Sequence, residues 1–550
     1  MKLSLKNGKI LEAPVGTTLL ELSKLVQQDY ASAIVIANVD NEVRDLQYKL
    51  FADCEVEFFE ILSEQGLRVY ERSLIFLLVR AVEDLYPSAD VKIKYTIGSS
   101  LYGELHGITR INSDTIFEIE KKMRDLVAEN IPFLREVVPI ANAIKLFQAE
   151  NKPSKARLLK YRDQETAYVY SCGDSKNYFY SYMVPSTGYL KTFDLKYYMP
   201  GFVICLPQAN DFTKTAVFKE SPKLYHVFQN AEKWTKVLMI DDVGSFNDAI
   251  MDGKGEEIVW LAEALQEKLI SKIADEITNS SDEKRLICIA GPSSSGKTTT
   301  AKRLSIQLRV NGLSPISISL DDYFVEREKT PLDEFGNYDF ESLYALDLEL
   351  FNKQLKSLIE GEEVYLPSFN FITGRRELLG RNIKINIDQP IIIEGIHALN
   401  EVLTSSIPRH YKYKIYISPL TQMNLDEHNR IPTTDARKIR RIVRDNRTRN
   451  AGAEKTLSMW ASVRRGEDKN IFPFQEDADV LLNTHLMYEL AVLKPFAKPL
   501  LDGVPRESPY YPEAKRLSKF LSFFVDLDSS LVPSNSIVRE FVGNSCFYQE

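Results

Sequence analysis

The segment Gly291-Pro-Ser-Ser-Ser-Gly296-Lys297-Thr298 constrains the fold of this 550-residue chain more than any other. It fits the pattern GxxxxGK[ST] without a mismatch, and it lies between a strand-like stretch (RLICIA) and a helix-like stretch (TTTAKRLSIQL). Glycines let such a loop wrap so that its backbone N–H groups point at phosphate oxygens, and the helix N-terminus adds a positive dipole end. The spacing therefore predicts a phosphate-binding loop, with Lys297 reaching the β/γ-phosphates and Thr298 coordinating Mg²⁺.

The stretches that follow this loop indicate a parallel sheet. RLICIAG, PISISLDD and PIIIEG are short, continuous apolar runs separated by helix-like segments, which is typical of strands covered on both faces. We therefore expect a P-loop α/β domain that binds ATP. The expected cofactor-binding residues are Gly291, Ser293, Ser294, Ser295, Gly296, Lys297, Thr298 and Thr299.

Acidic residues end two of these apolar runs. Asp321 and Asp322 follow PISISL, and Glu394 ends PIIIE. Since ligands of open α/β sheets bind at the carboxyl ends of the strands, Asp321 could accept the proton of an attacking hydroxyl or hold Mg²⁺ through water. Glu394 has the character of a Walker B residue that contacts the metal, beside Thr298. The alternatives are an Asp that only caps the next segment and a Glu that only ends a strand.

A basic segment follows at residues 437–449, where seven of thirteen residues are Lys or Arg. At helical spacing, Arg437, Arg440, Arg441 and Arg444 fall on one broad face. Such a face could bind nucleic acid, clamp a transferring phosphoryl group as a lid, or simply be solvated. The position after the Walker B-like strand favours the lid.

Composition excludes several classes of protein. Hydrophobic residues make up 44% and charged residues 27%, as in soluble globular proteins, and no apolar run reaches the roughly 18 residues of a membrane span. The N-terminus lacks a secretory pattern, so we expect a cytoplasmic protein without a membrane partner. The net charge of −8 implies no global attraction to nucleic acid. Five cysteines without a CxxC pair and six histidines without HxxxH spacing predict no structural zinc site.

The length suggests about three to four domains. Texture along the chain predicts a small α+β unit at 1–62, opened by an Asn7-Gly8 hairpin turn. It further predicts an α+β unit at 63–225, a helical connector at 226–282, the P-loop α/β unit at 283–490 and a helical C-terminal extension at 491–550. The fold class is thus multi-domain, α+β followed by α/β.

Residues 285–490 resemble the uridine kinase/phosphoribulokinase family of P-loop kinases. The resemblance rests on GPSSSGKTT, SLDDYF, NYDF, PSFNF, IIIEGIHAL and RRIVRDNRTR. It implies that Asp321 is the catalytic base, that Lys297, Arg444 and Arg449 take part in phosphoryl transfer, and that Glu394 and Thr298 hold the metal. The implied substrate-binding residues are Asp339, Phe369, Asn370, Phe371 and Arg447.

The chain departs from this family in the base pocket. Phe369 stands where Tyr is usual, and Asn370 stands where Asp is usual. The His that reads a pyrimidine falls near Gly374 here. These departures leave the base of the substrate open, whereas the phosphoryl-transfer residues are unaffected.

The N-terminal part resembles other modules. Residues 1–62 resemble a TGS domain, a β-grasp fold, and residues 63–225 resemble the second, editing domain of threonyl-tRNA synthetases. The four metal-ligand positions of that domain hold Arg72, Phe76, Phe179 and Met183 here, which are not zinc ligands. The resemblance therefore implies a domain that has lost aminoacyl-tRNA hydrolysis and serves as a scaffold or sensor.

Three functions follow as hypotheses. The first is an ATP- and Mg²⁺-dependent kinase of a nucleoside 5′-hydroxyl, in which Asp321 takes the hydroxyl proton while Lys297, Mg²⁺ and the lid arginines stabilise the transferred group. The second is an RNA- or tRNA-binding regulatory protein with a nucleotide switch. The third is a kinase of another hydroxylated metabolite. An RNA or protein partner of the N-terminal domains and an oligomeric state remain open.

Overall fold

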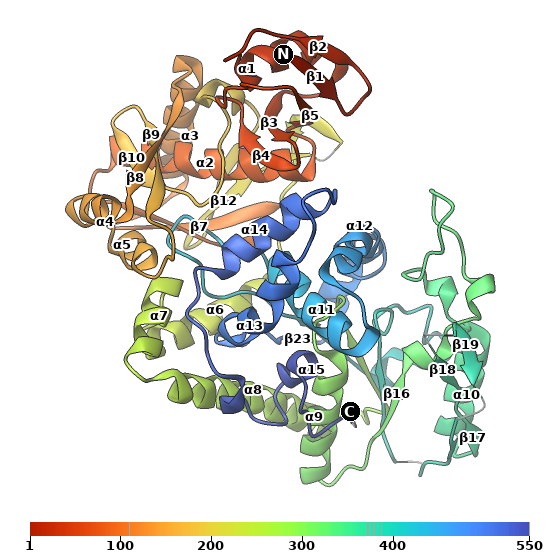
Figure 1. The fold of residues 1–550 in the computed structure, drawn as a ribbon. Coiled ribbons are helices and arrows are strands. Elements are labelled where there is room, and N and C mark those ends of the chain that lie inside the picture. The colour runs from red at the N-terminus through yellow and green to blue at the C-terminus, as the bar shows by residue number, and fades with distance from the viewer. Residues whose placement is uncertain (109, 209, 371–372, 378–379, 387, 549–550) are drawn as a thin grey trace.

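A computed structural model describes residues 1–108, 110–208, 210–370, 373–377, 380–386 and 388–548. The chain forms an N-terminal lobe, red to yellow in Figure 1, and a C-terminal lobe built around a parallel sheet. Helices near the C-terminus lie between the two lobes. Among the described residues, no helix combines the length and the apolar character that a membrane span needs.

The first unit is the expected β-grasp fold. It consists of β1 (Lys2–Leu5), β2 (Ile10–Glu12), α1 (Leu19–Val26), β3 (Ile34–Val39), β4 (Glu42–Asp45) and β5 (Cys54–Glu60). The sheet order is β2-β1-β5-β3-β4, with β1 and β5 parallel. Gly8 takes a φ of +86° in the predicted hairpin turn. A capping box between Thr18 and Glu21 starts α1.

The second unit combines four helices with two antiparallel sheets. Its helices are α2 (Glu64–Leu85), α3 (Ser113–Glu129), α4 (Ile140–Ala149) and α5 (Pro153–Lys160). Its main strands are β6 (Asp90–Ile97), β7 (Ser100–His106), β8 (Phe133–Pro139), β9 (Thr166–Cys172), β10 (Ser175–Tyr178), β11 (Asp194–Tyr198) and β12 (Gly201–Cys205). The sheet orders are β11-β12-β7-β6 and β10-β9-β8, which is the predicted α+β class.

Three helices connect this unit to the kinase-like domain: α6 (Pro222–Leu238), α7 (Val243–Met251) and α8 (Gly255–Thr278). Two expected boundaries need correction. The boundary at 225/226 lies inside α6, and the boundary at 490/491 lies inside α13 (Glu489–Asp502). The second helix cannot be divided there, because Leu490 and Leu493 on either side of the cut are buried in one core.

The C-terminal lobe contains the predicted parallel sheet. Its strands are β15 (Leu286–Ala290), β16 (Ile316–Ser319), β21 (Ile391–Glu394), β22 (Lys412–Ser418) and β23 (Val480–Asn483). They run parallel in the order β16-β21-β15-β22-β23. Alternate residues of β15 enter different cores, since Cys288 packs on one side and Ile289 on the other. Both faces of the sheet are covered, as the continuous apolar strands predict.

Helices surround this sheet: α9 (Lys297–Val310), α10 (Leu348–Ile359), α11 (Thr433–Arg449) and α12 (Ala453–Asn470). Two small hairpin-like pairs beside α10, seen to the right in Figure 1, complete the lobe: β17 (Val364–Tyr365) with β20 (Asn382–Ile383), and β18 (Ser368–Asn370) with β19 (Arg375–Glu377).

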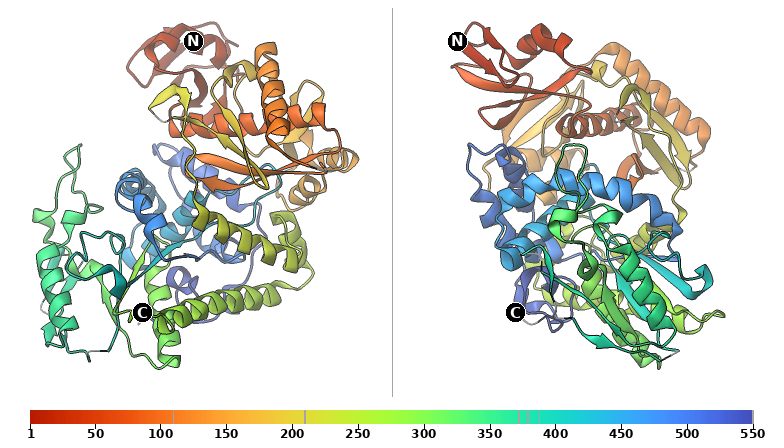
Figure 2. Two further views of the ribbon diagram at one scale, coloured as in Figure 1. Left: turned by 180° about the vertical axis from the view of Figure 1, so that it is seen from behind. Right: turned by 90° about the vertical axis from the view of Figure 1, so that its right-hand side faces the viewer.

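The C-terminal extension is an integral part of this lobe. After α13 come α14 (Tyr511–Leu521) and the short α15 (Arg539–Val542). Phe520 and Phe541 are fully buried in the same core as Ile439 of α11. The chain then ends beside α9, as both Figure 1 and the left view of Figure 2 show.

Candidate active site

The phosphate-binding loop joins the central strand β15 to α9. Ser294 and Gly296 take left-handed φ angles of +60° and +84°. A Cβ on Gly296 would lie 2.6 Å from Cγ2 of Ile537, and one on Gly291 would collide with the carbonyl of Ile417. Close packing therefore requires both glycines, and the left-handed backbone conformation also favours glycine at position 296. The resulting cradle of backbone N–H groups at a helix N-terminus suits a phosphate chain.

Three arginines of α11 hold the loop from outside. Nε of Arg437 donates to the carbonyl of Ser293 (3.0 Å), and Nη1 of Arg440 donates to the carbonyl of Ser294 (3.2 Å). Nη1 of Arg441 donates to Oγ of Ser293 (2.9 Å). The helix expected to act as a lid therefore also supports the loop.

Two of these arginines are buried as ion pairs. Arg437 pairs with Glu467 of α12, with one bond of 2.9 Å. Arg440 pairs with Glu489 of α13 through bonds of 2.9 and 2.5 Å, and neither side chain is exposed. This burial does not fit the nucleic-acid patch or the solvated face considered for this segment, because the basic residues at its centre do not reach solvent.

Lys297, Thr298 and Glu394 meet at the carboxyl edge of the sheet. Nζ of Lys297 donates to the carbonyls of Gly291 (3.1 Å) and Pro292 (3.2 Å). Oε1 of Glu394 accepts from the Thr298 hydroxyl (3.2 Å) and also from a serine at the end of β16. Burial raises the pKa of Glu394 to about 7, and the charge of Asp321 acts in the same direction. A hydroxyl and a carboxylate side by side are oxygen donors of the kind that Mg²⁺ prefers.

The two aspartates after β16 have different surroundings. Asp321 is exposed at this edge, and its charge raises the pKa of Glu394 while opposing the lowering that burial imposes on the pKa of Lys297. Asp322 accepts the backbone N–H of Phe369 (3.3 Å), and burial raises its pKa. Asp322 is therefore tied to β18, whereas Asp321 faces the region of Lys297.

Asp445 organises the remaining lid arginines. This fully buried carboxylate accepts from Arg441 (3.2 Å) and Arg444 (2.8 Å), and it lies 3.6 Å from Arg449. Burial alone would raise the pKa of Asp445, but the three guanidinium groups lower it. Arg447 points elsewhere, since its guanidinium donates to the carbonyls of Glu540 (3.0 Å) and Phe541 (3.3 Å) in the C-terminal extension. The structure thus groups Arg444 with Arg449 and separates them from Arg447.

The expected substrate residues lie in the segments between β16 and β19. Oδ1 of Asp339 accepts the backbone N–H of Glu341 (3.2 Å). The ring of Phe369 packs against Phe324 with a centroid distance of 5.8 Å. The side chain of Asn370 donates to Glu377 (2.6 Å) within the β18–β19 pair. Phe371 lies outside the described residues.

Several residues near the site carry no sequence motif. Burial raises the pKa of Glu341 to about 7, with the charges of Asp321 and Asp339 adding to the effect. The Thr299 hydroxyl, an expected cofactor contact, donates to Glu540 (2.7 Å) and lies 3.1 Å from the hydroxyl of Tyr548. No local pattern signals these contacts, because they join segments far apart in the chain.

Three of the four positions that the synthetase resemblance aligns with metal ligands lie in a hydrophobic core. Phe76, Phe179 and Met183 are buried together, and the rings of Phe76 and Phe179 are 5.5 Å apart. Arg72 donates to the carbonyl of Tyr182 (2.7 Å). Within the described ranges, no three His, Cys, Asp or Glu side chains are grouped so that they could hold a metal ion.

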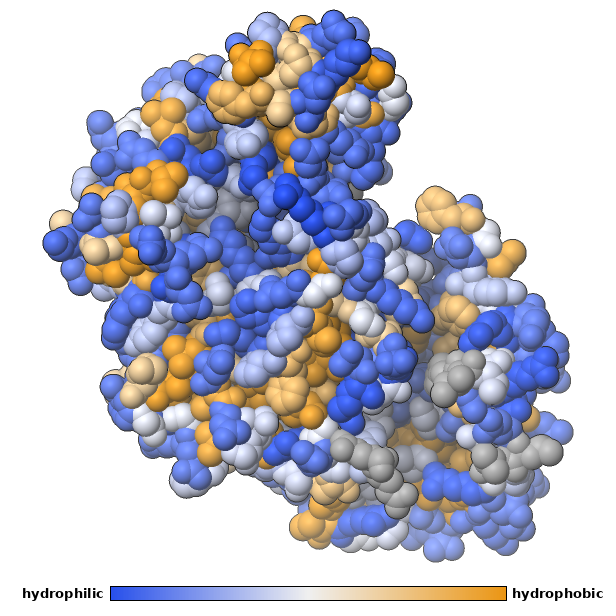
Figure 3. Space-filling model, in the orientation of Figure 1, coloured by the Kyte–Doolittle hydropathy of each residue, from blue (hydrophilic) through white to orange (hydrophobic). Residues whose placement is uncertain are grey.

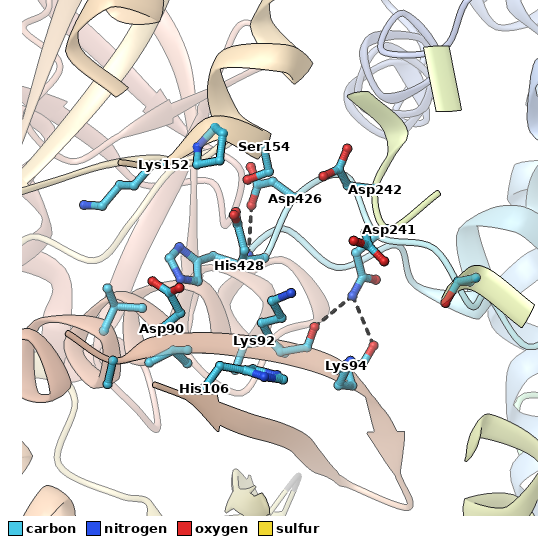
Figure 4. A pocket seen from close by; sticks show the side chains of 18 of the residues that line it. Asp90, Lys92, Lys94, His106, Lys152, Ser154, Asp241, Asp242, Asp426 and His428 are labelled. Atoms are coloured by element: carbon cyan, nitrogen blue, oxygen red, sulfur yellow. Dashed lines mark hydrogen bonds between the residues drawn. The ribbon is translucent and has the colours of Figure 1, made fainter. Parts of the chain in front are cut away.

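Cavities also occur at the junction of the lobes. One of about 640 Å³ lies between the β6–β7 hairpin and the loop that precedes α11 (Figure 4). Asp90, Lys92 and Lys94 line one side of it, opposite Asp426 and His428. No residue of the phosphate-binding loop lines it, so it is separate from the candidate active site.

Two family models match separate parts of the chain. Residues 286–486 match the phosphoribulokinase/uridine kinase family, and residues 1–60 match the TGS domain. The threonine–tRNA ligase of Clostridium kluyveri is 30% identical over 196 residues, which are 36% of this chain and 31% of the ligase. That of Francisella tularensis subsp. novicida is 28% identical over 189 residues, 34% of this chain and 30% of the ligase. The chain thus spans about a third of the length of these curated relatives.

Solved structures also resemble the chain. One described as a possible uridine kinase from Bacillus stearothermophilus is 22% identical, with a TM-score of 0.27, and the match covers 39% of this chain and 97% of that chain. A D-glycerate 3-kinase from Cryptococcus neoformans is 14% identical, with a TM-score of 0.23, over 48% of this chain and 87% of that chain.

Proposed function

We propose that this chain, whose residues 286–486 match a family of P-loop kinases, transfers the γ-phosphoryl group of ATP to the 5′-hydroxyl of a nucleoside. The observation that carries the proposal is the hydrogen bond from Thr298 to Glu394, with Lys297 and Asp321 at the same edge of the sheet. This edge holds a phosphate cradle, two metal-type oxygen ligands and the exposed carboxylate of Asp321. Phosphoryl transfer requires these components together.

Each side chain has a defined task in the proposed reaction. Mg²⁺-ATP, when bound, supplies the phosphoryl group and an electrophilic phosphorus. The backbone of the loop and the ammonium of Lys297 bind the phosphates, and Thr298 with Glu394 would hold the metal. Asp321 accepts the proton of the attacking hydroxyl, since it is exposed at this edge and not committed to β18 as Asp322 is. Asp445 orients Arg444 and Arg449 for contact with the transferred group.

A nucleoside suits the residues around Asp339. Tyr338 and Phe340 flank this aspartate with side chains that are 43% and 45% exposed, and their ring centroids are 6.1 Å apart. Exposed aromatic rings can stack on a base, while the neighbouring carboxylate of Asp339 can accept hydrogen bonds from ribose hydroxyls. Phe369 contributes less to this argument, because its ring packs against Phe324.

The test measures ADP release by the purified full chain with Mg²⁺-ATP. The panel contains nucleosides, sugar phosphates and glycerate, and mass spectrometry identifies the phosphorylated position. We expect turnover with at least one nucleoside and a 5′-phosphate product. Turnover only with a sugar phosphate or glycerate would instead identify a kinase of another metabolite. ATP binding without turnover on any compound would favour the nucleotide switch.

A further inference from the structure

A second cavity at the junction of the lobes is lined mainly by positive charge. It has a volume of about 480 Å³ and lies between the β-grasp unit, α2, the strands β8 and β9, the start of α11 and α14. Nine arginine and lysine side chains line it, against four glutamates. In Figure 3, strongly hydrophilic side chains gather where the N-terminal lobe meets α14. We call this space the junction cavity.

Two of its cations lack a carboxylate partner. Arg72 of α2 donates to the carbonyl of Tyr182 (2.7 Å) and lies over the ring of Tyr180 at 5.4 Å. Lys519 of α14 donates to the carbonyl of Tyr180 (2.8 Å) and lies 5.7 Å from the ring centroid of Tyr168. In the part of the chain that the structure describes, neither forms an ion pair. Both cations therefore make their hydrogen bonds and ring contacts with neutral groups.

Other cations of the cavity show the contrast. Arg516 forms bonds of 2.7 Å with Asp435, and Arg135 lies 2.9 Å from Asp45. Among the described residues, carboxylates thus form ion pairs with some of these positive charges but not with Arg72 or Lys519. Partial burial of a cation without a counter-charge disfavours its charged form. A bound anion would consequently stabilise the positive charges at these two positions by supplying a counter-charge.

Four positive charges act on Lys519. Burial lowers its pKa to about 8, and the charges of Arg162, Arg72, Arg135 and Lys515 act in the same direction. These groups come from α5 and its following turn, α2, β8 and α14 itself. A lysine held among four cations indicates a locally positive field. Such a field favours anionic ligands.

We propose that the junction cavity binds a small organic phosphate of about nucleotide size, with its phosphate on Arg72 and Lys519. Guanidinium and ammonium groups bind phosphate through charge-assisted hydrogen bonds. The volume lies within the range of roughly 300–1,000 Å³ that is typical of small-molecule sites. Tyr168 and Tyr182, both half-buried in the wall, offer rings and hydroxyls to the organic part.

The junction cavity and the phosphate-binding loop are connected through one helix, α11. Pro432 and Thr434, at the start of α11, line the junction cavity, and a helix N-terminus adds to the attraction for an anion. Further along the same helix, Arg437 and Arg440 hold the loop. A ligand in the junction cavity would thus contact the helix that supports the candidate active site.

Calorimetric titration of the full chain with inorganic pyrophosphate tests this proposal, which does not rest on the proposed function. We expect two binding sites in the natural protein, one at the phosphate-binding loop and one in the junction cavity. Lys297→Ala should weaken the first and leave the second. Adding Arg72→Gln and Lys519→Gln to that variant should weaken the remaining site by about 10- to 100-fold.

The matched control is Lys122→Gln in the Lys297→Ala variant, since Lys122 pairs with Asp84 (3.0 Å) and does not line the cavity. It should bind pyrophosphate as the parent does. Circular dichroism checks the fold, and the single variant Lys519→Gln, on the outer helix α14, repeats the test with a smaller change. The proposal is overturned if Lys297→Ala abolishes all pyrophosphate binding. It is also overturned if neither Lys519→Gln alone nor Arg72→Gln with Lys519→Gln weakens the binding that remains in the Lys297→Ala variant. Loss of phosphoryl transfer alone would not affect this readout.

Discussion

The hydroxyl of Thr298 donates a hydrogen bond of 3.2 Å to Oε1 of Glu394. One residue belongs to the first turn of α9 and the other to the last position of β21. The bond joins the phosphate-binding loop to the neighbouring strand at the edge where Asp321 also lies. The expected cofactor, metal and base residues therefore form one site.

Asp321→Asn is the most direct test of the proposed base. Removing a positioned base lowers turnover by about 10²–10⁴-fold. The affinity for ATP should change little, because among the described residues the side chain of Asp321 forms no hydrogen bond with the phosphate-binding loop. Steady-state ADP release and ATP titration measure the two effects. Asp322→Asn is the control, since Asp322 is bonded to Phe369. Unchanged turnover in Asp321→Asn would exclude it as the base.

Glu394 should make stability depend on pH. The pKa of Glu394 is about 7 in the folded chain against an ordinary 4.5. The protonated side chain therefore stabilises the folded state in full below about pH 4.5, and this stabilisation is lost as the pH rises through about 7. Glu394→Gln removes this loss. At about 1.4 kcal/mol per pKa unit, the free energy of unfolding of the variant, relative to that of the natural protein, should rise by on the order of 2–3 kcal/mol from acid to alkaline pH.

Melting temperatures of both proteins at about pH 5 and about pH 8, without Mg²⁺, measure that difference. The exposed Glu360→Gln is a suitable control, because Glu360 lies on the surface at the end of α10. If the gap between the natural protein and Glu394→Gln does not widen with pH, the raised pKa is not a property of the folded protein.

Arg440→Met should destabilise the C-terminal lobe by about 3–5 kcal/mol, since it removes the guanidinium that pairs with the buried carboxylate of Glu489 and leaves only His485 and a backbone N–H beside that charge. The double variant Arg440→Met with Glu489→Leu should recover much of this loss. Thermal unfolding followed by circular dichroism compares them. Arg464→Met is the control, because Arg464 is 40% exposed and its pair with Asp468 contributes about 0–1 kcal/mol. Equal effects of Arg440→Met and Arg464→Met would contradict the structural role of the buried pair.

We expect the purified protein to contain no stoichiometric zinc after dialysis. Phe76 and Phe179 fill the space with apolar rings, and Phe76→Ala should cost about 3–5 kcal/mol as a buried cavity mutation. Elemental analysis and thermal unfolding are the two measurements. One zinc per chain, lost when residues 1–221 before α6 are removed, would show that other residues of this region bind metal.

Local patterns predicted much of the site because its demands are local. The phosphate-binding loop needs glycine at two positions and a helix start, and Gly291, Gly296 and Lys297 provide them within eight residues. The short apolar strands predicted a parallel sheet, so the carboxyl ends of β16 and β21 had to meet. That geometry is why Asp321 and Glu394 could be named before the fold was known.

The amino-acid sequence by itself thus determined the loop, the class of sheet and the edge where the acidic residues meet. Only the tertiary structure decided which charges are buried, because burial depends on partners from distant segments. In the sequence, Arg437 and Arg440 suggest a basic surface. In the structure they form buried ion pairs with Glu467 and Glu489 on later helices. Arg72 and Lys519, from opposite ends of the chain, line one cavity without a carboxylate partner in the described residues. No periodicity encodes such long-range pairing, since it arises from the packing of whole units against one another.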